Sequence, residues 1–151
     1  MTCERTVVAL AASILAMAPA PLAAQPAGGT PPEDIAITVS RSADGIALSE
    51  DAITLAVGKY YRLGFACTSS DAGDPSFSFD TTPLLRDVHL RVLTVDAIEV
   101  YLQGLSFRAL QCEGAGSVRF SFYPMRAGNY AVPITDQTDD AVKTSLRVTV
   151  E

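Results

Sequence analysis

The sequence has a single histidine, His89, no tryptophan and only three cysteines among its 151 residues. A serine–histidine–acid triad would have to use His89, and no Gly-x-Ser-x-Gly motif presents a nucleophile. No Cys-x-x-Cys pair is present, so thiol–disulfide catalysis has no support. These absences remove the common hydrolase and redox motifs and favour a domain that is not an enzyme.

Positive charge is also scarce. The chain has 11 Lys and Arg residues against 17 Asp and Glu residues, which gives a formal net charge of −6. Nucleic acids require a basic footprint for their phosphates, and anionic membrane surfaces attract basic segments. The composition therefore argues against both as partners, whereas a basic protein partner is compatible with it.

The only long apolar run lies at the N-terminus. A short polar start is followed by an alanine-rich apolar stretch over residues 6–17, and small residues lead to Ala24. This layout predicts a secretory signal peptide over residues 1–24, cleaved before Gln25. An N-terminal membrane anchor is the alternative, but the run is shorter than the about 20 residues needed to span a bilayer. We therefore expect a periplasmic or secreted protein, with no membrane insertion after cleavage.

Residues 25–34 are rich in proline and glycine and predict a flexible linker, which leaves residues 35–151 as one domain. Within it, short runs alternate apolar and polar residues, for example at Ile35, Ile37 and Val39. Turn residues recur at intervals of roughly eight to twelve positions. This texture predicts an all-β Greek-key sandwich of about seven to nine strands.

Helical periodicity is absent after the signal peptide, and we expect at most one short helix or helical turn. The two candidate segments are residues 82–86 and residues 136–142.

Two cysteines, Cys67 and Cys112, remain after signal cleavage, because Cys3 leaves with the signal. In an exported domain they most simply form one disulfide. Cys67 continues the apolar alternation of Leu63 and Phe65, which places it on the same face as the core. Two buried free thiols, or metal and redox use, are the alternatives.

Residues 117–133 form the most informative stretch, because they predict two strands joined by a tight turn before the step Gly128-x-Tyr130. This pattern resembles the last hairpin of cupredoxin domains, in which a strand ending in Gly-x-Tyr leads into the copper-binding loop. Residues 53–63 resemble the early strand pair of that family. Residues 83–90 resemble its first histidine segment, a Pro-His-Asn step followed by an apolar strand. The resemblance spans about residues 35–151.

The resemblance also shows where copper ligands should stand. A blue-copper centre needs two imidazoles and a thiolate, but the His-Asn positions hold Arg86 and Asp87, and the thiolate position holds Pro133. His89 is offset by three residues and so faces away from that position, while Met125 is interpreted as a turn or packing residue. We therefore expect neither a metal site nor a cofactor, with copper as the one alternative.

Three carboxylates, Asp136, Asp139 and Asp140, occupy the loop that resembles the copper-binding end. Because this end is the docking surface of electron-transfer cupredoxins, we interpret the three as a partner-docking candidate, with an ordinary solvated loop as the alternative. The sequence thus predicts an exported cupredoxin-like binding or accessory module that engages a periplasmic protein. A copper or electron-transfer protein with an unconventional site, and a generic immunoglobulin-like adhesion or assembly domain, are the alternatives.

Overall fold

The computed structural model describes residues 29–96, 98–101 and 107–151, so the predicted signal peptide lies outside the described residues. This part of the chain is β-structure with one short helix, α1 (Thr82–Leu85). Its eleven strands are β1 (Glu33–Ser42), β2 (Gly45–Leu48), β3 (Ala52–Leu55), β4 (Tyr61–Thr68), β5 (Ser76–Asp80), β6 (Val88–Val95), β7 (Ile98–Tyr101), β8 (Ala109–Glu113), β9 (Gly116–Pro124), β10 (Gly128–Asp136) and β11 (Lys143–Val150). The all-β prediction is confirmed. Eleven strands exceed the expected number, and β1 already begins inside the predicted linker.

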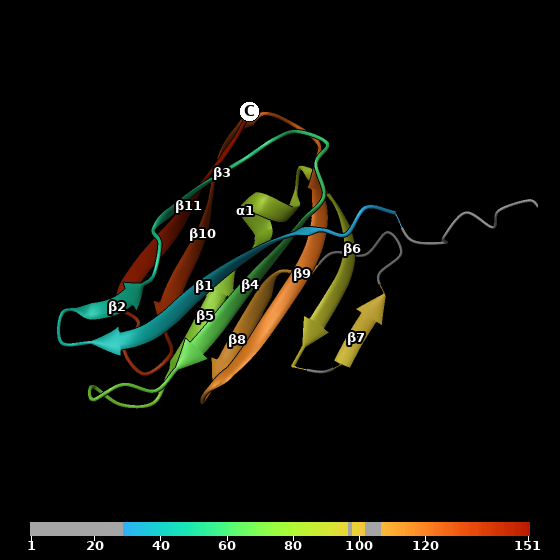
Figure 1. Cartoon of the computed structure of the whole chain (residues 1–151). Coiled ribbons are helices and arrows are strands. Elements are labelled where there is room, and N and C mark those ends of the chain that lie inside the picture. The colour runs from blue at the N-terminus through green and yellow to red at the C-terminus, as the bar shows by residue number, and fades with distance from the viewer. Residues whose placement is uncertain (1–28, 97, 102–106) are drawn as a thin grey trace, which may run out of the picture.

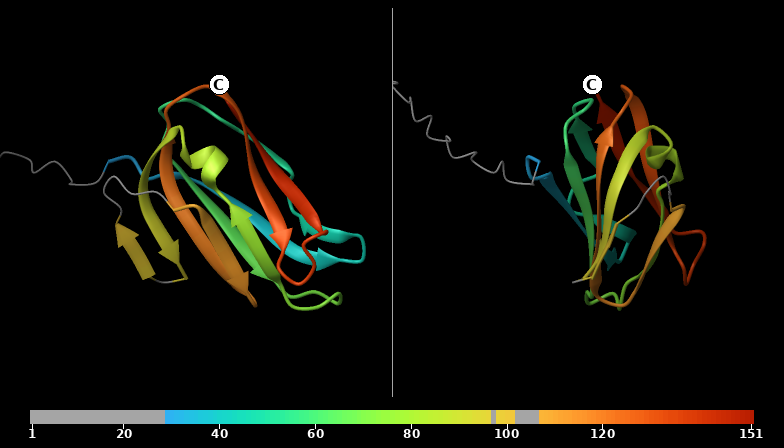
Figure 2. Two further views of the ribbon diagram at one scale, coloured as in Figure 1. Left: turned by 180° about the vertical axis from the view of Figure 1, so that it is seen from behind. Right: turned by 90° about the vertical axis from the view of Figure 1, so that its right-hand side faces the viewer.

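The strands form two sheets packed face to face (Figures 1 and 2). Sheet A has the order β2-β1-β4-β9-β6-β7, and sheet B has the order β3-β11-β10-β5-β8. Most neighbours are antiparallel, but β1 pairs with β4 in parallel and β11 pairs with β3 in parallel. This mixed pairing excludes a constant-type immunoglobulin sandwich, which is antiparallel throughout.

The core lies between the sheets and is formed by the apolar members of the predicted alternations. Phe65 of β4 stacks on Phe79 of β5 across the interface, with 4.5 Å between ring centroids. Burying each large apolar side chain contributes about 1.5–3 kcal/mol. Other fully buried core residues are Ile37, Val39, Leu63, Phe77, Phe120, Phe122, Val132, Ile134 and Leu146.

The two strands joined by the turn at residues 125–127 do not form a hairpin, contrary to the sequence-based expectation. Strand β9 pairs with β4 and β6 in sheet A, whereas β10 pairs with β11 and β5 in sheet B. The turn therefore carries the chain from one sheet to the other. Alternation fixes which face of a strand is buried, but it does not specify the neighbouring strand.

The predicted disulfide between Cys67 and Cys112 is confirmed, with 6.4 Å between the two Cα atoms. It joins β4 of sheet A to β8 of sheet B and so ties the two layers together. The first predicted helical segment forms α1, in which Pro83 suits the first turn and Leu84 is buried. None of the described helices has the length and apolarity required to cross a bilayer.

Candidate functional site

Three loops meet at one end of the sandwich, which we call the acidic end: residues 43–44, 69–75 and 137–142 (Figure 1). Arg41, near the end of β1, holds them together. Its Nε donates to the carbonyl of Asp74 at 2.8 Å, and its own carbonyl accepts from the Ser70 hydroxyl at 2.8 Å. The third loop begins after Asp136, with which the Arg41 guanidinium forms a salt bridge.

The salt bridge between Arg41 and Asp136 has two contacts. Arg41 Nη1 donates to Asp136 Oδ2, and Arg41 Nη2 donates to Asp136 Oδ1 at 2.9 Å. The same Nη2 donates to the Thr138 hydroxyl at 2.9 Å, and the guanidinium lies 5.7 Å from the centroid of the Phe77 ring. The Arg41 side chain is 20% exposed and that of Asp136 only 2%. A bidentate pair with these additional partners fixes the geometry of the 69–75 and 137–142 loops relative to β1.

The carboxyl of Asp136 is held in its charged form. Burial alone raises its pKa, but hydrogen bonds from the Thr138 hydroxyl and backbone N–H, together with Arg41, lower the pKa below its ordinary value of 3.8. Thr138 donates from its backbone N–H at 2.8 Å and from its hydroxyl at 2.7 Å to Oδ1. Asp136 therefore stays ionised at neutral pH and neutralises the guanidinium.

Sequence reasoning missed Arg41, although a signal for it exists. Arg41 follows Ile37 and Val39 at alternate positions of β1, and Asp136 follows Val132 and Ile134 in the same way on β10. Each charged residue thus ends an inward-facing apolar row. One cation and one anion in such positions predict a buried ion pair, since neither charge is stable in a core alone.

The predicted docking set is divided by the structure. Asp139 and Asp140 are exposed, whereas Asp136 is buried and paired with Arg41. Including Asp136 in an exposed docking surface was therefore wrong, because its charge is already neutralised inside the fold. Further exposed carboxylates join Asp139 and Asp140 at or beside the acidic end: Asp44, Asp71, Asp74 and Glu113.

Arg86 and Asp87, the positions aligned with the His-Asn pair, lie at the opposite end of the sandwich. We call this the helix end: α1, residues 86–87 and the turn at 125–127. The Tyr130 hydroxyl donates to Asp87 Oδ2 at 3.3 Å and to the carbonyl of Arg126 at 3.0 Å. Burial and then the Asp87 charge raise the pKa of Tyr130. Asp136 is six residues further along β10, about 20 Å away. Residues 86–87 and the loop after Asp136, which resembles the metal loop, therefore cannot share one site, and aligning residues 86–87 with the first histidine segment was wrong.

The strand that does begin beside the end of β10 is β5. Phe77 pairs with Asp136, and the Gln137 N–H donates to the Ser76 carbonyl at 2.9 Å. Neither this segment nor the 137–142 loop contains histidine, cysteine or methionine. A guanidinium cannot coordinate a cation, so the residues at this end do not fit a blue-copper centre.

The remaining potential ligands lie elsewhere. His89 is exposed on β6, where its ring meets Tyr123 edge-on at 6.5 Å between centroids. Met125, in the turn after β9, is 60% exposed. Among the described residues, no group of three or more His, Cys, Asp or Glu side chains could hold a metal ion.

Solved structures with a similar fold come from copper enzymes. A multicopper oxidase from Pediococcus acidilactici matches with a TM-score of 0.55 and 12% identity, over 88% of this chain and 29% of the oxidase. A copper nitrite reductase from Nitrosomonas europaea matches with a TM-score of 0.52 and 8% identity, over 79% of this chain and 49% of the reductase. A laccase from B. aclada matches with a TM-score of 0.51 and 15% identity, over 78% of this chain and 29% of the laccase. The chain thus spans less than half the length of each.

No family model and no curated protein matches the sequence. At these identities the structural matches establish the fold alone. The chain is an all-β, two-sheet sandwich of cupredoxin type, as the sequence pattern predicted, similar to domains of multicopper oxidases.

Proposed function

We propose that the protein is an exported, cupredoxin-like binding module without a blue-copper centre, which docks a basic protein partner through its acidic end. The observation that carries this proposal is the Arg41–Asp136 pair. At the end where the resemblance places a metal loop, a guanidinium instead links the loops through Asp136, Thr138 and Asp74.

Loops that are fixed before binding suit a docking surface. Association loses free energy when flexible loops and side chains must be ordered, and loops already held by hydrogen bonds avoid part of that loss. The 137–142 loop has a further fixed turn, because Asp139 accepts from the Ala141 N–H at 3.0 Å through its carboxylate. The acidic end therefore presents its carboxylates from a defined scaffold.

The charge of this end favours a basic partner. Exposed Asp71, Asp139 and Asp140 carry negative charge, while the guanidinium of Arg41 is neutralised by Asp136. Surface charge of one sign accelerates encounter with an oppositely charged partner and makes the association sensitive to salt. The signal-like N-terminus supports a partner in the periplasm or outside the cell.

Site-specific photo-crosslinking in cells that produce the protein tests the proposal. A photoreactive residue at position 140 should crosslink one protein, and the exposed position 126 at the helix end should not crosslink it. The double variant D139N/D140N should lower the crosslinked yield severalfold, since two carboxylates are lost. Asn at position 139 retains a side-chain acceptor for the turn, so folding is preserved.

Copper loading supplies the complementary measurement. Purified mature protein, exposed to Cu(II) or Cu(I) and then dialysed, should retain less than one equivalent of copper and show no intense blue band. Stoichiometric copper with such a band would refute the proposal. Equal crosslinking of the same protein from positions 140 and 126 would refute the docking surface.

A further inference from the structure

Strand β8 is the last strand of sheet B and pairs on one side only. Residues Ala109–Glu113 pair with β5, and no other described strand pairs with β8. Its second edge thus presents backbone N–H and C=O groups without strand partners, a template for an added strand. The edge has only one charged residue, Glu113, and no proline to block pairing.

Sheet A extends beyond this edge. Cys112 of β8 is bonded to Cys67 of β4, and sheet A continues past β4 through β9, β6 and β7. The end of β6 and the start of β9 therefore face a space that sheet B does not fill. A groove of about 340 Å³ lies there, lined by residues 95–96 and 109–118.

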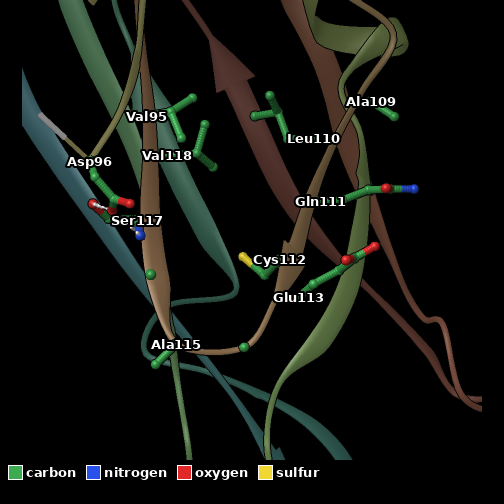
Figure 3. A pocket seen from close by; sticks show the side chains of 12 residues that line it. Val95, Asp96, Ala109, Leu110, Gln111, Cys112, Glu113, Ala115, Ser117 and Val118 are labelled. Carbon is green, nitrogen blue, oxygen red and sulfur yellow. Dashed lines mark hydrogen bonds between the residues drawn. The ribbon is translucent and has the colours of Figure 1, made fainter. Parts of the chain in front are cut away.

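The groove is apolar on its inner side. Figure 3 shows the side chains of Val95, Leu110 and Val118 pointing into the space between β6, β8 and β9. Gln111 and Glu113 point away from it. Val95 is 46% exposed, a large exposed fraction for a valine beside an unpaired strand edge. An added strand on β8 would place alternate side chains against Val95, Leu110 and Val118.

We infer that this groove receives one extended peptide segment, which pairs with the free edge of β8 as an added strand. The inference rests on the proposed function and names the binding mode of the partner. Every second side chain of the segment is apolar and packs into the groove, while its backbone bonds to residues 109–113.

The rim of the groove indicates the charge of the segment. Asp96 is exposed beside the groove, and Glu113 is exposed on the outer face of β8, where it would flank an added strand. Asp96 has a positive φ of 50°, and its Oδ1 accepts from the Ser117 N–H at 3.2 Å, which holds the carboxylate beside the opening. A segment with Lys or Arg next to its apolar residues matches these carboxylates and the adjacent acidic end.

Antiparallel pairing with β8 of a second copy does not fit this edge. Antiparallel pairing of two β8 strands requires a two-fold axis perpendicular to sheet B, which puts both copies of sheet A on the same side. Since sheet A continues beyond β8 through β6 and β7, the two overhanging sheets would occupy the same space.

The test uses the synthetic peptide KVTVTVK and backbone amide NMR of the full domain. Adding the peptide should shift the amides of residues 95, 109–113 and 116–118. Two N-methylated analogues, one methylated on its valines and the other on its threonines, should differ strongly in affinity, because only one edge of an added strand bonds to β8.

Matched variants identify the groove. V95N should weaken peptide binding about fivefold, because it removes an apolar contact. V57N should leave binding within about twofold, since Val57 has the same 46% exposure but lies outside the groove. Equal losses of peptide affinity in the two variants would overturn the inference. So would amide shifts confined to residues outside the groove, or the absence of any amide shift at the highest soluble peptide concentration.

The inference and the proposed function can fail separately. D139N/D140N should weaken crosslinking of the native partner, yet it should change peptide affinity less than V95N does. If the peptide binds at β8 but D139N/D140N does not lower the crosslinked yield of the native partner, only the acidic docking surface is refuted. If D139N/D140N lowers that yield but the peptide does not bind, only the added strand is refuted.

Discussion

The two ends of the sandwich hold ion pairs of different kinds. At the acidic end, Arg41 meets an almost fully buried carboxylate, and additional hydrogen bonds connect the pair to two loops. At the helix end, Arg86 and Arg126 are 73% and 75% exposed and lie 3.8 and 3.7 Å from Asp87. Exposed pairs contribute little to stability, whereas breaking a buried pair is strongly destabilising. The acidic end is therefore organised by electrostatics, and the helix end by apolar packing around α1.

The largest expected effect comes from the disulfide, which lies toward the acidic end. The double variant C67S/C112S should lose about 4 kcal/mol of unfolding free energy, because the bond closes a loop with a sequence separation of 45. Urea denaturation measures the loss. Hydrogen exchange should show strands β4 and β8 losing more protection than α1, and a uniform loss would contradict the contrast between the ends.

Breaking the buried pair should have the next largest effect. R41A should lower the unfolding free energy by about 3 kcal/mol, since it leaves the Asp136 carboxylate buried without its cation. The matched variant R126A at the helix end should change it by less than about 0.5 kcal/mol. Chemical denaturation of the two variants compares the ends directly, and equal losses would show that the acidic end is not organised by Arg41.

Acid should weaken the acidic end through Asp136. A carboxyl whose folded pKa is lowered contributes stability that is fully present above its ordinary pKa, here 3.8, and that is lost as the pH falls through the lower folded value. The stability difference between wild type and D136N should therefore be constant near neutral pH and shrink below about pH 4. Denaturation at a series of pH values checks this, with D140N as the exposed control. A difference independent of pH would contradict the lowered pKa.

The smallest effect is expected at the helix end. Y130F removes the hydroxyl that donates to Asp87 and to the Arg126 carbonyl, and it should lower the unfolding free energy by about 1 kcal/mol. In wild type, burial and the Asp87 charge raise the pKa of Tyr130, so its ultraviolet titration should occur above that of a free tyrosine. D87N should move this titration back toward lower pH. If the titration does not move, the Asp87 charge does not contribute to the raised pKa of Tyr130.

The sequence predicted the layers of the fold better than their connections. Alternation identified the buried faces of β1, β4 and β11, because side-chain direction in a strand is a local property. It could not show that β9 and β10 belong to different sheets, since pairing depends on contacts between distant segments. The same limit explains why Arg86 was aligned with a copper-ligand position, although it lies at the helix end and the loop after β10 lies at the acidic end.

The candidate site was predicted only in part. The exposed carboxylates Asp139 and Asp140 follow from a polar loop between strands, which is a local signal. The partner of Asp136 is 95 residues away at Arg41, and the only sequence signal for that contact is that each charge ends an inward-facing apolar row. The unpaired edge of β8 could not be predicted from the sequence either, because an unpaired edge is defined by the strand order of the whole sheet.

The position of β11 has a consequence for how the chain acquires its structure. This final strand lies between β3 and β10, and its residues Leu146, Val148 and Val150 are buried. Sheet B thus lacks a central member until Lys143–Val150 has paired with both neighbours. Its partner β3 lies far away in the sequence, since Arg147 pairs with Ala52, and distant pairings of this kind slow folding. We therefore expect the closure of sheet B to be a late step in folding.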